Sequence, residues 1–129
     1  MNGYKVTIKS VHADHEMTAK ERIMFKDTTN AIKLDEATQD QEDKLMITPV
    51  AWGVLAIHND KSDNPDYDNY IVVDKTGDKY VTGSKAFWSA FETIVEEIQD
   101  EGVEDWGILV YRMPSKNYKG KDFITCSVI

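Results

Sequence analysis

The chain of 129 residues contains a single cysteine, Cys126, so it cannot form a disulfide within itself. A chain of this length buries a sufficient core without such cross-links. No apolar run approaches the roughly 20 residues of a membrane-spanning helix. The start, MNGYKVTIKS, lacks the apolar core of a signal peptide. These absences predict one domain over residues 1–129, located in the cytoplasm and without a membrane partner.

The sequence also lacks the short motifs of the common enzyme classes. It has no GxSxG, no P-loop, no HExxH and no GxGxxG that follows a strand. Cys126 lacks a local base that would activate its thiol. His12 and His15 can share one face of a helix, but zinc takes three or four ligands, and His58 and Cys126 are distant in sequence. We therefore expect no enzyme, no metal and no other cofactor.

Basic residues are missing from one stretch and acidic residues from another. Residues 92–105 contain seven carboxylates and no base, whereas residues 111–121 contain four bases and no carboxylate. The formal net charge of -8 averages over these two stretches. Its sign argues against attraction of the whole surface to nucleic acid or an anionic membrane, but it permits one local basic site.

The pattern of apolar residues predicts secondary structure along most of the chain. Alternation predicts a strand over residues 4–11, and helical spacing predicts a helix over residues 17–26. Residues 36–44 have no apolar period and are predicted as a solvated loop. The run LMITPVAWGVLAIH (residues 45–58) predicts one long strand, with Pro49 at its start and a bulge or bend at Gly53.

Two further strands, residues 67–74 and 79–83, are expected to form a hairpin, because Gly77 lies where the turn requires a positive φ. Ser84 can cap a helix that ends at Gly102. The apolar side of that helix consists of Phe87, Phe91, Ile94, Val95 and Ile98. Residues 106–113 and 122–129 are expected to be the last two strands.

From residue 45 onward the predicted order is three strands, a helix and two strands. This is the order of elements in the five-stranded OB barrel. We therefore predict a mainly β chain with two helices, in the α+β class: an OB-like barrel over residues 45–129 with a strand-helix extension over residues 1–44. The rival architecture is an open antiparallel sheet with two helices on one face, and the order of elements fits both.

The segment YRMPSKNYKGKDF (residues 111–123) joins the last two predicted strands. In OB folds this loop and the face of the second and third strands hold oligonucleotides. Cations follow the phosphates, and aromatic rings stack on bases. The predicted nucleic-acid-binding residues are Trp52, Tyr70, Tyr111, Arg112, Lys116, Tyr118, Lys119, Lys121 and Phe123. The alternatives are a hairpin with solvated lysines, which discourage edge pairing, and aromatic residues that belong to the core.

Three segments, MTAKERIMFKDTTNAIKLDEAT, VTGSKAFWSAF and PSKNYKGKDFITCSVI, resemble small proteins encoded by phages and prophages of Gram-positive bacteria. Such proteins include candidate single-stranded DNA-binding proteins of a replication and recombination module. The resemblance implies OB-like binding of single strands in the host cytoplasm, without chemistry and beside phage replication or recombination proteins. It assigns binding to Lys116, Tyr118, Lys119 and Lys121. The apolar end ITCSVI departs from the acidic, flexible tail of a typical single-strand-binding protein.

A second function fits the acidic stretch, residues 92–105. A helix with this many carboxylates can imitate a phosphate backbone and occupy a basic channel, so a small acidic phage inhibitor of a host nuclease or defence protein is the alternative. A solvated helix face explains the same charges without a partner. An exposed strand edge can also pair copies of the chain, which makes a homo-oligomer an expectation.

Overall fold

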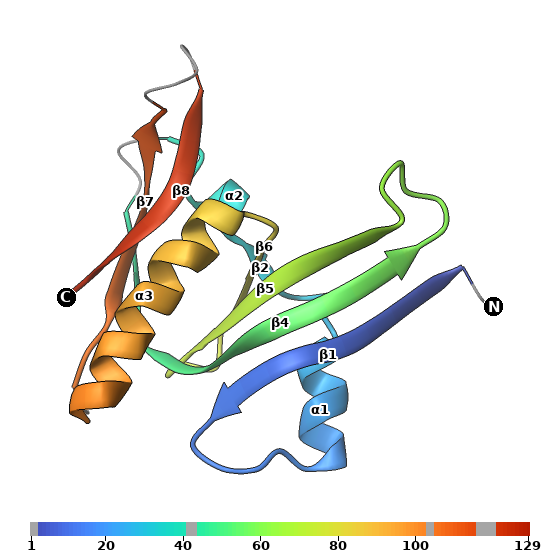
Figure 1. The fold of residues 1–129 in the computed structure, drawn as a ribbon, viewed down its shortest axis with the longest axis horizontal. Helices are drawn as coiled ribbons and strands as arrows, with labels where there is room; N and C mark the ends of the chain where they lie inside the picture. The colour runs from blue at the N-terminus through green and yellow to red at the C-terminus, as the bar shows by residue number, and fades with distance from the viewer. Residues whose placement is uncertain (1–2, 41–43, 103–104, 116–120) are drawn as a thin grey trace. The chain divides into compact units, whose positions relative to one another are not determined.

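The computed structural model describes residues 3–40, 44–102, 105–115 and 121–129. These residues form an α+β fold with two open sheets and three helices (Figure 1). The chain divides into two compact units, one of Met1–Ile32 and Val50–Gly83 and the other of Lys33–Pro49 and Ser84–Ile129. Each unit therefore combines segments that are distant in sequence. The expectation of a single domain over the whole chain stays a prediction.

The larger sheet has the strand order β1-β4-β5-β6-β2 and belongs mainly to the first unit. Its strands are β1 (Tyr4–Ala13), β4 (Pro49–Asn59), β5 (Asp66–Asp74), β6 (Lys79–Thr82) and the short β2 (Ile32–Lys33). β1 pairs antiparallel with β4, and β5 pairs antiparallel with β6. The predicted strand over residues 4–11 and the predicted hairpin at Gly77, with φ 95°, are confirmed.

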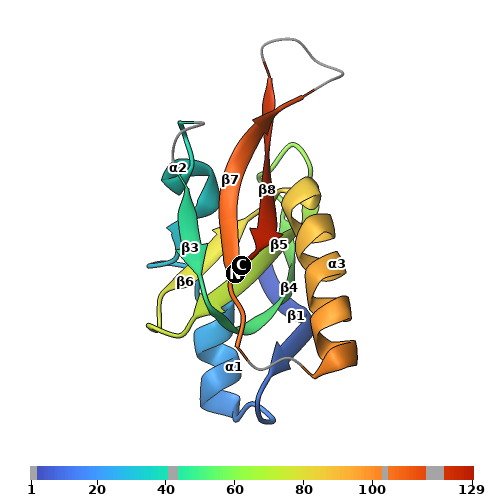
Figure 2. The same cartoon turned by 90° about the vertical axis from the view of Figure 1, so that its left-hand side faces the viewer.

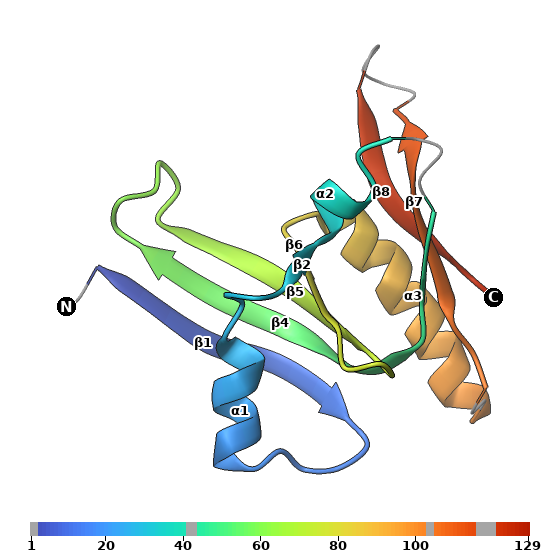
Figure 3. The ribbon, with the colours of Figure 1, turned by 180° about the vertical axis from the view of Figure 1, so that it is seen from behind.

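Helix α1 (Ala19–Lys26) lies against β1 of this sheet, as Figure 3 shows from behind. It begins with a capping box, in which the Thr18 hydroxyl accepts from the Glu21 amide and the Glu21 carboxylate accepts from the Thr18 amide. Its buried residue, Phe25, belongs to an apolar cluster. The other buried members of that cluster are Leu55, Ile57, Ile71 and Val81. The predicted helix over residues 17–26 is confirmed.

The smaller sheet belongs to the second unit and has the order β3-β7-β8 (Figure 2). Its strands are β3 (Leu45–Ile47), β7 (Ile108–Pro114) and β8 (Asp122–Val128). Helix α3 (Lys85–Glu101) packs against β8, and the short helix α2 (Leu34–Ala37) precedes β3. As predicted, Ser84 caps α3, its hydroxyl accepting from the Phe87 amide, and Gly102 ends it with φ 68°.

The predicted OB-like barrel is wrong, because neither sheet closes on itself. The run over residues 45–58 is two strands rather than one. β3 ends at Ile47 and pairs with β7, whereas β4 begins at Pro49 and pairs with β1. Proline has no amide hydrogen for a strand ladder, so the chain leaves one sheet and enters the other at this point. β1 is thus a strand of the β4 sheet and not an extension packed on a barrel, while the broader α+β prediction is confirmed.

Candidate nucleic-acid interface

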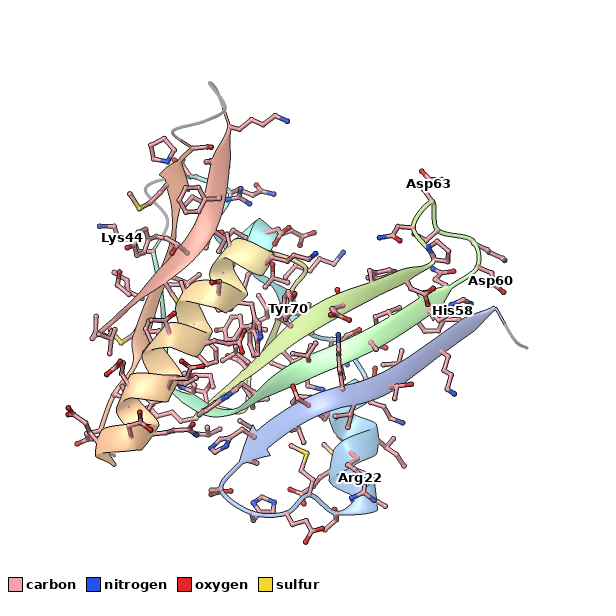
Figure 4. All side chains as sticks on the ribbon, in the orientation of Figure 1. Arg22, Lys44, His58, Asp60, Asp63 and Tyr70 are labelled. Carbon is pink, nitrogen blue, oxygen red and sulfur yellow. The ribbon has the colours of Figure 1, made fainter. Side chains whose placement is uncertain are left out.

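Two of the predicted binding residues, Trp52 and Tyr70, belong to the first unit. Trp52 on β4 is half-buried, and its ring stacks on His12 with 4.5 Å between the ring centroids and 22° between the planes. Tyr70 on β5 is buried (Figure 4). A buried tyrosine ring offers no free face to a base, so Tyr70 lacks the exposure that its predicted role requires.

Arg112 on β7 belongs to the second unit, and its guanidinium already contacts three acceptors there. Nε donates to the carbonyl of Thr38 at 2.5 Å, and Nη2 donates to the carbonyl of Asp35 at 3.0 Å. Nη1 donates to Oδ1 of Asp122 at 2.8 Å, and only 18% of the Arg112 side chain is exposed. Arg112 therefore ties the end of α2 to the β7–β8 hairpin. Its predicted contact with phosphate stays a prediction.

Three predicted residues of the connecting segment, Lys116, Tyr118 and Lys119, lie outside the described residues. The ladder between β7 and β8 is described on both sides of that segment. Ser115 donates its amide to the carbonyl of Lys121 at 2.9 Å, and Pro114 pairs with Asp122. The remaining predicted residues, Tyr111, Lys121 and Phe123, therefore have defined positions on the hairpin.

The pairing register places Tyr111 and Phe123 on the same face of the smaller sheet. Tyr111 is opposite Thr125, and Met113 is opposite Phe123. On β3, Met46 is opposite Leu109. Because side chains alternate between faces, one set of residues shares this side of the sheet. We call it the outer face: Met46, Leu109, Tyr111, Met113, Phe123, Thr125 and Ser127.

The opposite side of the same strands forms part of the core. Five residues on that side are buried: Ile47, Ile108, Val110, Ile124 and Cys126. On the outer face, by contrast, 65% of Met46, 42% of Met113 and 37% of Phe123 are exposed. An apolar surface in contact with solvent is the kind of patch that marks binding sites on soluble proteins.

The outer face carries aromatic rings and no carboxylates. None of its seven residues is acidic, and the nearby Asp122 carboxylate is paired with Arg112. The Tyr111 hydroxyl lies 2.6 Å from Oγ of Ser127, which fixes the ring across β7 and β8. In a chain with 23 acidic and 15 basic residues, a polyanion meets less repulsion on a face without carboxylates than on a face that carries them.

Two lysines flank the outer face. Lys121 is exposed and precedes Phe123 by two positions, so an extended backbone directs both side chains to one side. Lys44 precedes Met46 by two positions in the same way, and in Figure 4 its side chain extends on the side of the sheet that is away from α3. Rings between cations are the elements of a single-strand-binding surface.

The sequence pattern missed Met46, Leu109 and Met113 as members of this face. The signal was present on β7, where Leu109, Tyr111 and Met113 alternate with residues of the opposite side that include the buried Ile108 and Val110. The sequence does not show which of the two sets is covered, because both sets contain large apolar residues.

Nucleophilic and metal chemistry find no support among the described side chains. Burial raises the pKa of the Cys126 thiol to about 12, so the thiolate that would act as a nucleophile is scarce at neutral pH. Within residues 3–40, 44–102, 105–115 and 121–129, no three histidine, cysteine or carboxylate side chains are grouped so that they could hold a metal ion.

Comparison with known proteins gives no further guide to the site. No family model, no curated protein and no solved structure matches this chain. In the part of the chain that the structure describes, no helix combines the length and the apolar content of a membrane span.

Proposed function

We propose that this chain is a non-enzymatic single-stranded DNA-binding protein whose outer face stacks bases. The observation that carries the proposal is an open sheet face with Tyr111, Phe123 and exposed methionines, flanked by lysines and free of carboxylates. Each stacked base contributes on the order of 1–3 kcal/mol, and every base has a π-face, so binding depends little on sequence. The setting is a phage replication and recombination module, as the resemblance implies.

Fluorescence anisotropy with a fluorescein-labelled oligo-dT of about 15 nucleotides tests the proposal. Phe123→Ala removes an exposed ring, and we expect affinity to fall about 10- to 100-fold. Tyr4→Ala is the matched control, because Tyr4 is an exposed ring on β1 in the other unit. We expect the control to bind as the natural chain does.

Salt dependence tests the cationic part of the site. Loss of one phosphate contact lowers the slope of log affinity against log salt by about 0.7 for a single strand. We expect this change for Lys121→Ala and not for Lys61→Ala, which removes an exposed lysine of the first unit. Absence of oligo-dT binding at low salt, or equal losses in the Phe123 and Tyr4 variants, overturns the proposal.

One observation favours the second function, an acidic inhibitor that binds the basic channel of a host nuclease or defence protein. The described carboxylates of α3 are exposed: Glu92, Glu96, Glu97, Asp100 and Glu101. The last turn of α3 has no base and the first turn has no acid, so these charges oppose the helix dipole. A carboxylate near the C-terminal end of a helix lowers stability by about 0.3–1 kcal/mol. A role in binding a basic partner would explain why the chain has several carboxylates there. Glu104 lies outside the described residues.

A pull-down from host lysate separates the two functions. An inhibitor retains a host protein in stoichiometric amount and loses it when Glu96, Glu97, Asp100 and Glu101 are changed to the corresponding amides. If the fourfold variant still binds oligo-dT and the natural chain retains no host protein, the second function is rejected.

A further inference from the structure

The first unit contains a cavity of about 550 Å³ beside α1. It is bounded by the segment that joins β1 to α1, by α1 itself, by the start of β4, and by β6 with the turn before it. All of its lining residues belong to the first unit. We call it the α1 groove. Its volume lies in the range of sites that hold small ligands or several side chains of a partner.

The walls of the α1 groove are apolar and in part uncovered. Phe25 and Ala51, both buried, line it, and Met17 and Val73 add further apolar surface. Two other lining residues are exposed, Met24 to 58% and Val50 to 45%. An apolar surface of this kind gains free energy when another molecule covers it.

The charged residues of the groove give it a negative sign. Four carboxylates line it, those of Asp14, Glu21, Asp27 and Asp78, against two groups that can be cationic, His15 and Lys79. Even with both of these protonated, the sum is two negative charges, from -4 and +2.

Neither cation is available to an anionic ligand. The His15 ring lies between Asp14 and Glu21, with its nitrogens 2.6 and 2.7 Å from their oxygens. The Lys79 ammonium donates to the carbonyls of Met24 and Asp27 at the end of α1. The carboxylates that line the groove outnumber its cations, and the Lys79 ammonium already donates to two carbonyls, so a cation is favoured over an anion.

We propose that the α1 groove binds a basic amphipathic segment of a partner protein. The apolar side chains of the segment cover Met24 and Val50, and its lysines or arginines face the carboxylates. The exposed walls fit an extended or helical segment laid into a groove rather than an enclosed small molecule. The site lies in the first unit, whereas the outer face lies in the second, so this inference does not depend on the proposed DNA binding.

Fluorescence anisotropy with the full chain and a labelled amphipathic peptide of lysine and leucine, (KLLKLLK)₂, tests the apolar contact. Met24→Ser removes an exposed apolar side chain that lines the groove, and we expect about tenfold weaker binding. The matched control is Ile23→Ser, because Ile23 is the neighbouring exposed residue of α1 but does not line the groove. We expect little change in the control, and circular dichroism confirms that both variants fold.

A second pair of variants tests the charge. Asp27→Asn with Asp78→Asn removes two carboxylates of the groove, and Asp60→Asn with Asp63→Asn removes two from the β4–β5 turn (Figure 4). We expect weaker binding and a shallower salt dependence for the first pair only. The charge-reversed peptide (ELLELLE)₂ should not bind.

Three results overturn the proposal: no binding of (KLLKLLK)₂, equal losses in the two members of either variant pair, or equal binding of the two peptides. Equal losses would mean diffuse attraction to an acidic protein. Oligo-dT affinity should be the same in Met24→Ser and the natural chain, so failure of the groove and failure of the proposed DNA binding are distinguishable.

Discussion

At the scale of single residues, Arg112 connects three parts of the second unit through one guanidinium group. The Arg112 guanidinium donates hydrogen bonds to two carbonyl groups at α2 and to the Asp122 carboxylate of β8. Lysine carries one ammonium and cannot reproduce this planar arrangement. Hydrogen bonds to charged groups contribute about 1.5–3 kcal/mol each, so we expect Arg112→Lys to lower the free energy of unfolding by about 2–4 kcal/mol in urea denaturation.

Lys121→Ala provides the control for this prediction. Lys121 is exposed, and a substitution at such a position changes stability by no more than about 0.5 kcal/mol. If Arg112→Lys is as stable as the Lys121 variant, the three contacts contribute no net stability and this prediction is wrong.

The sequence could not show this role of Arg112. Its carbonyl partners, Thr38 and Asp35, are 74 and 77 positions away. The local composition, four bases within residues 111–121, suggested a phosphate-binding group instead. Local charge indicates which residues are cationic, but the acceptor of a half-buried arginine is set by tertiary packing. The same limit applies to Tyr70, whose alternating strand pattern fits burial and exposure equally well.

At the scale of elements, the approach of β1 to β4 depends on Gly53. A Cβ at this position would lie 2.3 Å from the backbone oxygen of Ser10 and 3.1 Å from the ring of Phe25. The oxygen belongs to the backbone of a paired strand and cannot move without disturbing the ladder. We expect Gly53→Ala to cost about 2–3 kcal/mol in urea denaturation, or to prevent folding.

Gly83→Ala is the matched control, because its added Cβ would meet no atom closer than Asn69 Oδ1 at 4.0 Å. Replacing glycine at an unstrained position leaves stability unchanged or raises it by about 0.4–1 kcal/mol. Equal stability of the two variants would mean that β1 can shift away from β4 at no cost.

The sequence predicted the elements of this fold better than their partners. Helix α1 was predicted from helical spacing, and helix α3 from helical spacing together with the cap residue Ser84, which are local signals. Gly53 was expected to mark a bulge or a bend, and the register shift of this strand pair lies on β1, between Ile8 and Ser10. The assignment of β3 and β4 to different sheets depends on pairing across long stretches of chain, which no local pattern encodes. The outer face could be predicted only once β3 and β8 were known to flank β7.

At the scale of the whole molecule, acidic residues outnumber basic ones, and two of the three histidines each lie within hydrogen-bond distance of two carboxylates. His58 lies between Asp66 and Asp60, with its ring nitrogens 2.7 and 2.6 Å from their oxygens. Figure 4 labels His58 and Asp60 near the β4–β5 turn. Hydrogen bonds to Asp66 and then Asp60 raise the pKa of His58 above its ordinary value. Hydrogen bonds to Asp14 and then Glu21 raise the pKa of His15 in the same direction.

These shifts set the sign of the pH dependence of stability. A histidine whose pKa is raised by folding stabilises the folded state fully below its unfolded pKa of about 6.5, and that contribution is lost as pH rises through the folded pKa. The negative net charge acts in the same direction, because protonation reduces self-repulsion. We therefore expect the free energy of unfolding to be higher at pH 6 than at pH 8.

The opposite trend sets in at lower pH. Hydrogen bonds from the Thr18 amide and then from His15 lower the pKa of Glu21, and those from Thr29 lower the pKa of Asp27. A carboxylate with a lowered pKa stabilises the fold above its unfolded pKa, and the contribution is lost as pH falls through the folded value. Stability should therefore decline again below about pH 4.

The double variant His15→Gln with His58→Gln isolates the histidine contribution from that of the net charge. Glutamine can accept or donate hydrogen bonds at both positions but does not titrate, so the variant should lose less stability between pH 6 and pH 8 than the natural chain. Urea denaturation at the two pH values measures the difference, and the NMR titration of each ring should show midpoints above the ordinary 6.5. If the variant loses as much stability between pH 6 and pH 8 as the natural chain, net charge alone sets the pH dependence. The hydrogen bonds of His15 and His58 to their carboxylates then contribute nothing to it.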